Sequence, residues 1–107
     1  MAQIYQVVIT DRAKESLRKI IAQVRERASI EVARKVKDGI ENEITSLNYM
    51  PTKNSILRGI NDKNITYRRI LKWSYRIIYT IEEDKLMVIV VEIDYARSNP
   101  KKLEDLK

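Results

Sequence analysis

Hydrophobic and polar residues follow two different periodicities along this chain, one in its first half and another in its second. Segment 3–9 is rich in β-branched and aromatic residues, which favours a strand. Apolar residues then recur every three or four positions through 13–24 and again through 32–47. That spacing is typical of a helix with one apolar face, so the first half predicts a strand followed by two amphipathic helices.

Polar residues mark where the two helices should begin and end. Thr10 and Asp11 precede the first helix and Ser29 precedes the second, and their side-chain oxygens can accept hydrogen bonds from first-turn amides. Pro51 follows the end of the second helix. Gly39 lies inside that helix, where it costs about 1 kcal/mol relative to alanine. It marks either close packing against a neighbour or nothing.

The second half has the rhythm of strands. Three strand-like runs, 65–71, 75–81 and 86–93, are separated by 72–74 and by the acidic segment 82–85. Connections this short predict antiparallel hairpins, because a parallel crossover needs a dozen or more residues. The last run is apolar on both faces, which suits a central strand.

This order of elements predicts one α+β domain over residues 1–107. Two N-terminal helices should pack on one face of a mostly antiparallel four-stranded sheet and leave the other face open. The arginines of the strands belong on that open face or at its rim. Pro100 sits at a first helical position, which favours a short final helix or a frayed tail.

Composition removes several classes of chemistry. The chain has no His and no Cys, so it holds no Ser-His-Asp triad, no cysteine nucleophile and no zinc site built from those residues. We expect no metal and no cofactor. No run approaches the ~20 apolar residues of a membrane span, and the first residues lack the features of a signal peptide. A cytoplasmic protein without a membrane partner is expected.

The positive charge is concentrated in the middle of the chain. The whole chain carries 21 Lys and Arg against 15 Asp and Glu, a net charge of +6. Segment 53–76 contains seven of the basic residues and one acidic residue. Its net charge of +6 therefore equals that of the whole chain. Such clustering suggests a polyanionic partner, most simply nucleic acid or the ribosome. A solvated basic face on an ordinary domain is the alternative.

If the partner is RNA, the available residues suit one reaction. The 2′-OH of RNA can attack the adjacent phosphorus, and arginine can neutralise the charge that develops there. Tyrosine or lysine could move protons, and Tyr95 or Trp73 could stack on a base. Each also has a structural interpretation: Tyr95 as core or rim, Trp73 as the cover of a turn, and Arg76 as a partner of Glu92 or Asp94.

Three segments resemble a known pattern. They are Tyr-Arg-Arg-Ile-Leu at 67–71, Tyr-Arg-Ile-Ile-Tyr at 75–79 and Val-Val-Glu-Ile-Asp-Tyr-Ala-Arg at 90–97. Their order and spacing resemble the RelE/ParE superfamily of type II toxins, often called plasmid stabilisation proteins. The resemblance extends over nearly all of the chain.

The resemblance implies a partner and one of two activities. Toxins of this superfamily are made with an antitoxin that masks them. RelE-like members cleave mRNA on the ribosome by the 2′-OH route and are mRNA interferases, whereas ParE-like members inhibit DNA gyrase without known nuclease chemistry. On the first interpretation the resemblance implies that Arg76, Arg97 and Tyr95 are catalytic, with Tyr95 standing where many relatives have His. The residues expected to bind RNA are Arg58, Arg68, Arg69 and Lys72.

Three functional classes therefore remain. The hypothesis ranked first is an endoribonuclease toxin acting on ribosome-bound mRNA. A gyrase-inhibiting toxin is second, and a binding protein of the same fold without toxicity is third.

Overall fold

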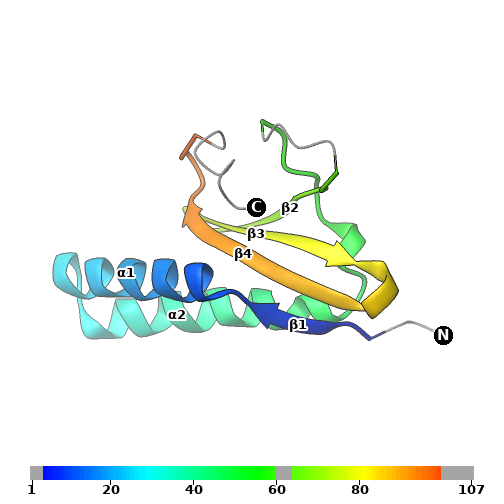
Figure 1. Ribbon diagram of the computed structural model, residues 1–107. Helices are drawn as coiled ribbons and strands as arrows, with labels where there is room; N and C mark the ends of the chain where they lie inside the picture. The colour runs from blue at the N-terminus through cyan, green and yellow to red at the C-terminus, as the bar shows by residue number, and fades with distance from the viewer. Residues whose placement is uncertain (1–3, 60–63, 100–107) are drawn as a thin grey trace.

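The computed structural model describes residues 4–59 and 64–99. The chain enters through β1 (Gln6–Ile9), which leads directly into helix α1 (Asp11–Arg27). Helix α2 (Ile30–Thr45) then runs back antiparallel to α1, and the two form a long hairpin (Figure 1). The predicted strand and both predicted helices are thus present.

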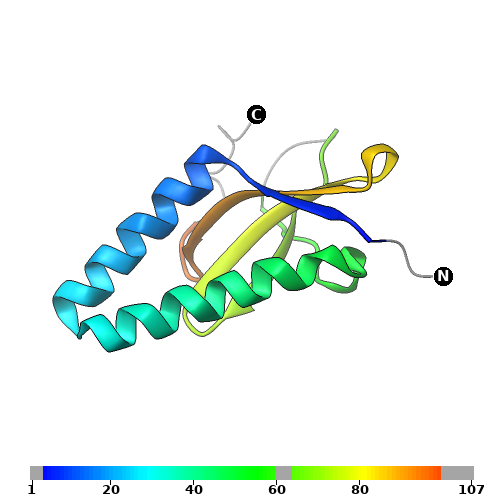
Figure 2. The same ribbon diagram turned by 90° about the horizontal axis from the view of Figure 1, so that it is seen from below.

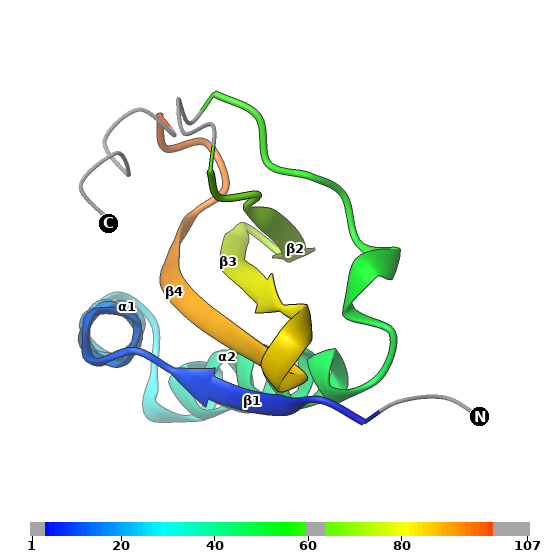
Figure 3. The same cartoon turned by 45° about the vertical axis from the view of Figure 1, so that its right-hand side comes forward.

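Three more strands follow and complete one sheet: β2 (Arg68–Lys72), β3 (Tyr75–Glu82) and β4 (Met87–Tyr95). The strand order is β1-β4-β3-β2, with β1 parallel to β4 and the other neighbours antiparallel. The helices cover one face of this sheet (Figures 2 and 3). The predicted α+β architecture is confirmed, and β4 is central, as its two apolar faces indicated.

Side-chain hydrogen bonds start both helices where the sequence predicts. The Thr10 hydroxyl accepts from the Ala13 amide at 3.1 Å, and the Ser29 hydroxyl accepts from the Val32 amide at 3.1 Å. Each bond satisfies one of the four amides that a first helical turn leaves unpaired.

The main core lies between the helices and the sheet. Ile20 and Ile40 bring the apolar stripes of α1 and α2 against Ile77 and Tyr79 of β3. Because side chains alternate across a strand, Arg76 and Ile78 of the same strand face away from the helices.

A β-bulge in β4 changes which side chains enter this core. Ile78 pairs with Glu92 and Tyr79 pairs with Val90, so Val91 is the extra residue. Without the bulge, strict alternation would put Glu92 on the same face as the buried Val90. The bulge instead puts Ile93 in the core, and the side chains of Glu92 and Asp94 lie outside it.

The face away from the helices is less open than the sequence predicts. Leu57 and Tyr67, from the chain before β2, pack on Ile78 in a second apolar cluster. The expectation of an open face was therefore wrong in this part, because Leu57 and Tyr67 cover it. The predicted final helix at Pro100 lies outside the described residues.

Gly39 has a partner that explains its place inside a helix. The hairpin between β2 and β3 turns at Trp73, whose φ is 52°, and its indole lies against Gly39 of α2. A Cβ at position 39 would come within 2.5 Å of two indole carbons. Of the two sequence interpretations of Gly39, close packing against a neighbour is the correct one.

Candidate functional site

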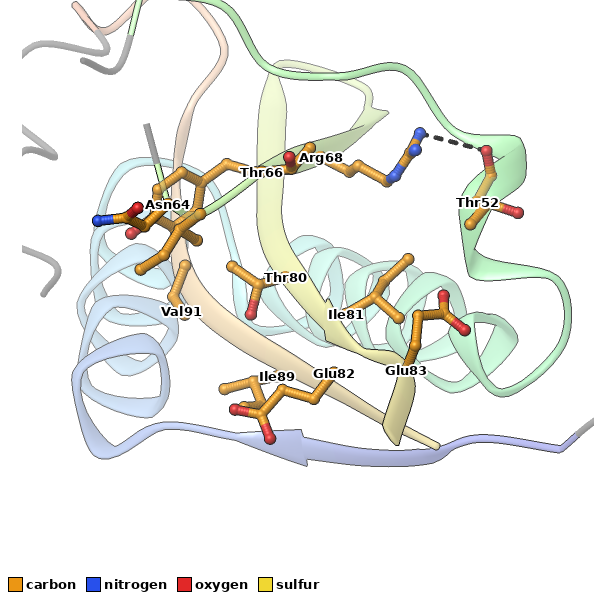
Figure 4. Close-up of a pocket in the computed structure, with 12 residues that line it drawn as sticks. Thr52, Asn64, Thr66, Arg68, Thr80, Ile81, Glu82, Glu83, Ile89 and Val91 are labelled. Carbon is orange, nitrogen blue, oxygen red and sulfur yellow. Dashed lines mark hydrogen bonds between the residues drawn. The ribbon is translucent and has the colours of Figure 1, made fainter. Parts of the chain in front are cut away.

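The face of the sheet away from the helices carries an open concavity of about 620 Å³. Thr80 of β3 and Ile89 and Val91 of β4 form its floor, and residues 64–68 overhang it (Figure 4). Glu82 lies at its lower end. Apolar and polar side chains both line the concavity, and Arg68 is the one basic residue among them.

Arg76, the first expected catalytic residue, lies on this face but is buried. Its Nε and Nη2 donate to the two carboxylate oxygens of Asp94 at 2.9 and 2.6 Å, and Nη2 also donates to the Ser98 carbonyl at 3.2 Å. The side chains of Arg76 and Asp94 are 4% and 9% exposed. This bidentate pair occupies the fork with which an arginine would bind a phosphate.

Tyr95 lies on the opposite side of the sheet. It pairs with Tyr75, their rings lie 5.4 Å apart, and its hydroxyl donates to Gln23 Oε1 of α1 at 2.5 Å. Because consecutive residues of a strand face opposite ways, Tyr95 cannot share a face with Asp94 and Arg76. The third expected catalytic residue, Arg97, is exposed beyond the end of β4. The structure therefore does not bring these three residues together.

Three of the four residues expected to bind RNA do converge. Arg58, Arg68 and Arg69 line one groove of about 670 Å³ between the loop 54–58 and β2. Lys72 lies elsewhere, with its ammonium 4.6 Å from the Trp73 ring and 3.6 Å from a Glu43 oxygen.

The loop, and not the register of β2, places these arginines around one groove. Arg68 pairs with Tyr79 and Arg69 pairs with Ile78, so the two arginines leave the strand on opposite sides, as their adjacency predicts. The Nη1 of Arg68 donates to the carbonyls of Thr52 and Asn54 at 3.2 and 2.7 Å. The guanidinium thereby ties the loop to the strand.

Two tyrosines of β3, Tyr75 and Tyr79, do not supply a base near neutral pH. Burial raises the pKa of Tyr79, although hydrogen bonding by Asn54 and the charge of Arg68 oppose the rise. Burial and the neighbouring Tyr95 likewise raise the pKa of Tyr75. Both phenols therefore stay protonated at neutral pH.

Sequence reasoning missed one buried polar cluster. Glu92 accepts from Arg12 Nε at 3.1 Å, from the Ser16 hydroxyl at 2.5 Å and from the Ile93 amide at 3.0 Å. These bonds join the first turns of α1 to the edge of β4 beyond the end of β1. The available signal was the carboxylate inside an otherwise apolar run, which needs a partner when buried.

A second groove lies on the helical hairpin. It encloses about 510 Å³, and its floor is formed by apolar side chains of β1 and α1. Four basic residues and one acidic residue stand around it. The floor residues are Ile9, Leu17, Ile21 and Ala22, and the charged residues are Lys14, Arg18, Arg25, Lys37 and Glu41.

Two classes of feature are absent from the part of the chain that is described. Residues 4–59 and 64–99 contain no group of three acidic side chains placed to hold a metal ion. Within the same ranges, neither helix has the length and apolar character that crossing a membrane requires.

Comparisons with known proteins identify relatives of this fold. A family model described as the ParE toxin of the type II toxin-antitoxin system parDE matches residues 7–100. No curated protein matches the chain. Among solved structures, the chromosomal ParDE system of P. aeruginosa has a chain with a TM-score of 0.69 at 15% identity, covering 86% of this chain and 96% of that one.

Two RelE-type structures are also similar. The RelBE complex of Mycobacterium tuberculosis has a chain with a TM-score of 0.57 at 18% identity, covering 90% of this chain and 95% of that one. A mutant of the E. coli toxin RelE in the free state gives 0.55 at 22% identity, with 89% and 86% covered. At these identities the structural likeness shows a shared fold.

Proposed function

The chain belongs to the ParE toxin family of type II toxin-antitoxin systems, and from that membership we propose that it is a gyrase-inhibiting toxin rather than an mRNA interferase. On this proposal it arrests growth by binding DNA gyrase in the cytoplasm and carries out no chemistry itself. It thus follows the second hypothesis that the sequence left open.

The observation that carries the proposal is the ion pair of Arg76. An arginine that serves the phosphate in RNA cleavage must present its fork to the substrate. Here both arms of the fork already bind Asp94, and the pair is almost completely buried. Opening it would leave a buried carboxylate without its partner, a change that costs about 3–5 kcal/mol. We therefore assign Arg76 a structural role.

Tyr95 and the two tyrosines of β3 support the same choice. Tyr95 bonds to Gln23 of α1 on the helix-covered side. Tyr75 and Tyr79 have raised pKa values, which makes them poor bases near pH 7. A protein inhibitor needs none of these groups to react, only a complementary surface.

We also propose that an antitoxin, most simply encoded by an adjacent gene, binds and neutralises this chain. The solved relatives include toxin-antitoxin complexes from Mycobacterium tuberculosis and Pyrococcus horikoshii. The apolar groove on the helical hairpin fits an amphipathic helix, and its surplus of basic residues favours one with acidic flanks.

One experiment separates the candidate activities. The chain is induced in cells without its antitoxin, and supercoiling by purified gyrase is assayed in parallel with mapping of mRNA ends on ribosomes. We expect growth arrest, inhibited supercoiling and intact mRNA. Co-expression of the antitoxin is the control and should restore growth.

Two other outcomes would contradict the proposal. New mRNA ends within translated codons, with supercoiling unaffected, would support the RelE-like endoribonuclease. Normal growth at full expression would support the non-toxic binding protein.

A further inference from the structure

We propose that the groove between loop 54–58 and β2, lined by Arg58, Arg68 and Arg69, binds the phosphate backbone of duplex DNA. This inference deepens the proposed function, because gyrase holds duplex DNA while it works and a toxin bound to it lies close to that DNA. The groove is separate from the antitoxin groove on the helices.

The first argument is charge. Three arginines and no acidic residue line the groove, whose other lining residues are Asn54, Ser55, Ile56 and Leu57. The concavity on the sheet, by contrast, has Glu82 and Glu83 among its lining. A groove whose charged residues are all positive attracts a polyanion, and the paired N–H groups of a guanidinium match the oxygens of a phosphate.

The second argument is that two of these arginines have no competing acidic partner. Among residues 4–59 and 64–99, neither Arg58 nor Arg69 forms an ion pair, in contrast to Arg76 with Asp94. Arg68 uses one guanidinium nitrogen to donate hydrogen bonds to the carbonyls of Thr52 and Asn54. Arg58 and Arg69 are therefore the residues expected to contact phosphates directly, and Arg68 positions the loop that carries Arg58.

The third argument is rigidity. The loop pairs with the outer edge of β2: the Leu57 amide donates to the Tyr67 carbonyl at 2.7 Å, and the Arg69 amide donates to the Ser55 carbonyl at 3.0 Å. Ile56 and Arg68 form the bridge between these bonds. Arginines held on paired backbone lose less entropy when they bind.

The absence of aromatic lining selects the duplex over a single strand. Grooves that bind single-stranded nucleic acid combine basic side chains with aromatic rings on which bases stack. This groove has three arginines and no aromatic residue among its lining. Contacts of this kind fix a protein on the backbone without reading the sequence.

The test measures binding of the purified chain to a fluorescent 20-base-pair duplex over a range of NaCl concentrations. Each phosphate contact contributes about 0.9 to the slope of log affinity against log salt. Arg58→Ala and Arg69→Ala should each lower the slope by about 0.9 and weaken binding about tenfold at 0.1 M salt. Arg27→Ala, the same change at the exposed end of α1, is the matched control and should leave both unchanged.

Several outcomes would overturn the inference. They are an unchanged slope in the Arg58→Ala/Arg69→Ala double variant, an equal loss in Arg27→Ala, or tighter binding to a single-stranded RNA of the same length. Because no gyrase is present in this assay, it separates the two proposals: duplex binding without inhibition of supercoiling would refute the gyrase assignment and leave this groove standing.

Discussion

Arg76 and Asp94 stand directly opposite each other on β3 and β4, and their side chains close a bidentate ion pair on the face of the sheet away from the helices. The pair also holds the Ser98 carbonyl, so it fixes the chain as it leaves β4. These contacts are the ground on which we propose a structural role for Arg76, in place of the catalytic role expected from the sequence.

The first prediction concerns the energetics of this pair. Arg76→Met or Asp94→Leu alone should lower the free energy of unfolding by about 3–5 kcal/mol, because each leaves a buried charge unpaired. The double variant should recover most of the loss. Urea denaturation of the wild type, the two single variants and the double variant measures the interaction energy of the pair as a double-mutant cycle.

The same double variant tests function. If Arg76 is structural, Arg76→Met/Asp94→Leu should still arrest growth at equal expression. Loss of toxicity in a variant that remains folded would return Arg76 to a role at the target. Circular dichroism of the purified variant supplies the control for folding.

The second prediction concerns Gly39 and Trp73. In Gly39→Ala the new methyl group would overlap the indole, so the indole must move away from its contact with α2. Trp73 is the only tryptophan in the chain, so its fluorescence should shift to longer wavelength as the ring becomes more hydrated. Glu41→Ala, an exposed change on the same helix, should not alter the emission. An unshifted spectrum in Gly39→Ala would contradict the packing.

With Trp73 present, Gly39→Ala should lower the free energy of unfolding, because the methyl group overlaps the indole. In the background of Trp73→Ala, the same substitution should raise the free energy of unfolding instead. With the ring absent, alanine should stabilise the helix by about 0.5–1 kcal/mol relative to glycine. Thermal unfolding of the two backgrounds measures the difference.

The third prediction concerns alkaline pH. The Tyr79 hydroxyl donates to the Pro51 carbonyl at 2.6 Å and accepts from Asn54 at 3.0 Å, and burial raises its pKa above the usual 10.0. The folded state thus favours the protonated phenol. This contribution is complete below pH 10.0 and is lost as pH rises through the folded-state pKa.

Urea denaturation between pH 8 and 11 should show stability falling above about pH 10. Tyr79→Phe should cost about 1–3 kcal/mol at neutral pH, where the Pro51 carbonyl loses its donor, and should make the alkaline fall shallower. An equally steep fall in the variant would show that other groups cause it.

The fourth prediction concerns the antitoxin. Ala22 is exposed on the floor of the helical groove, so Ala22→Glu should preserve the fold while placing negative charge where an acidic helix would lie. The affinity for the antitoxin should fall at least tenfold, and toxicity should persist when both proteins are made. Lys19→Glu, on α1 outside the groove, is the control. Unchanged affinity for Ala22→Glu would place the antitoxin elsewhere.

Much of the fold follows from local patterns. Thr10 and Ser29 start the helices as predicted, because a capping hydroxyl acts within three residues of its position. The short connection at Trp73 requires a hairpin. The candidate site was less predictable, because convergence of Arg58 with Arg69 depends on backbone pairing between segments that the sequence does not relate.

The sequence by itself determined the elements, their order, the layer that the helices cover and the concentration of positive charge, since each depends on neighbouring residues. The tertiary structure decided which of those charges are available. The bulge at Val91 shifts the alternation of β4, and Asp94 consequently meets Arg76 across the sheet. One extra residue in a strand reverses the facing of all that follow, and no local pattern reports it.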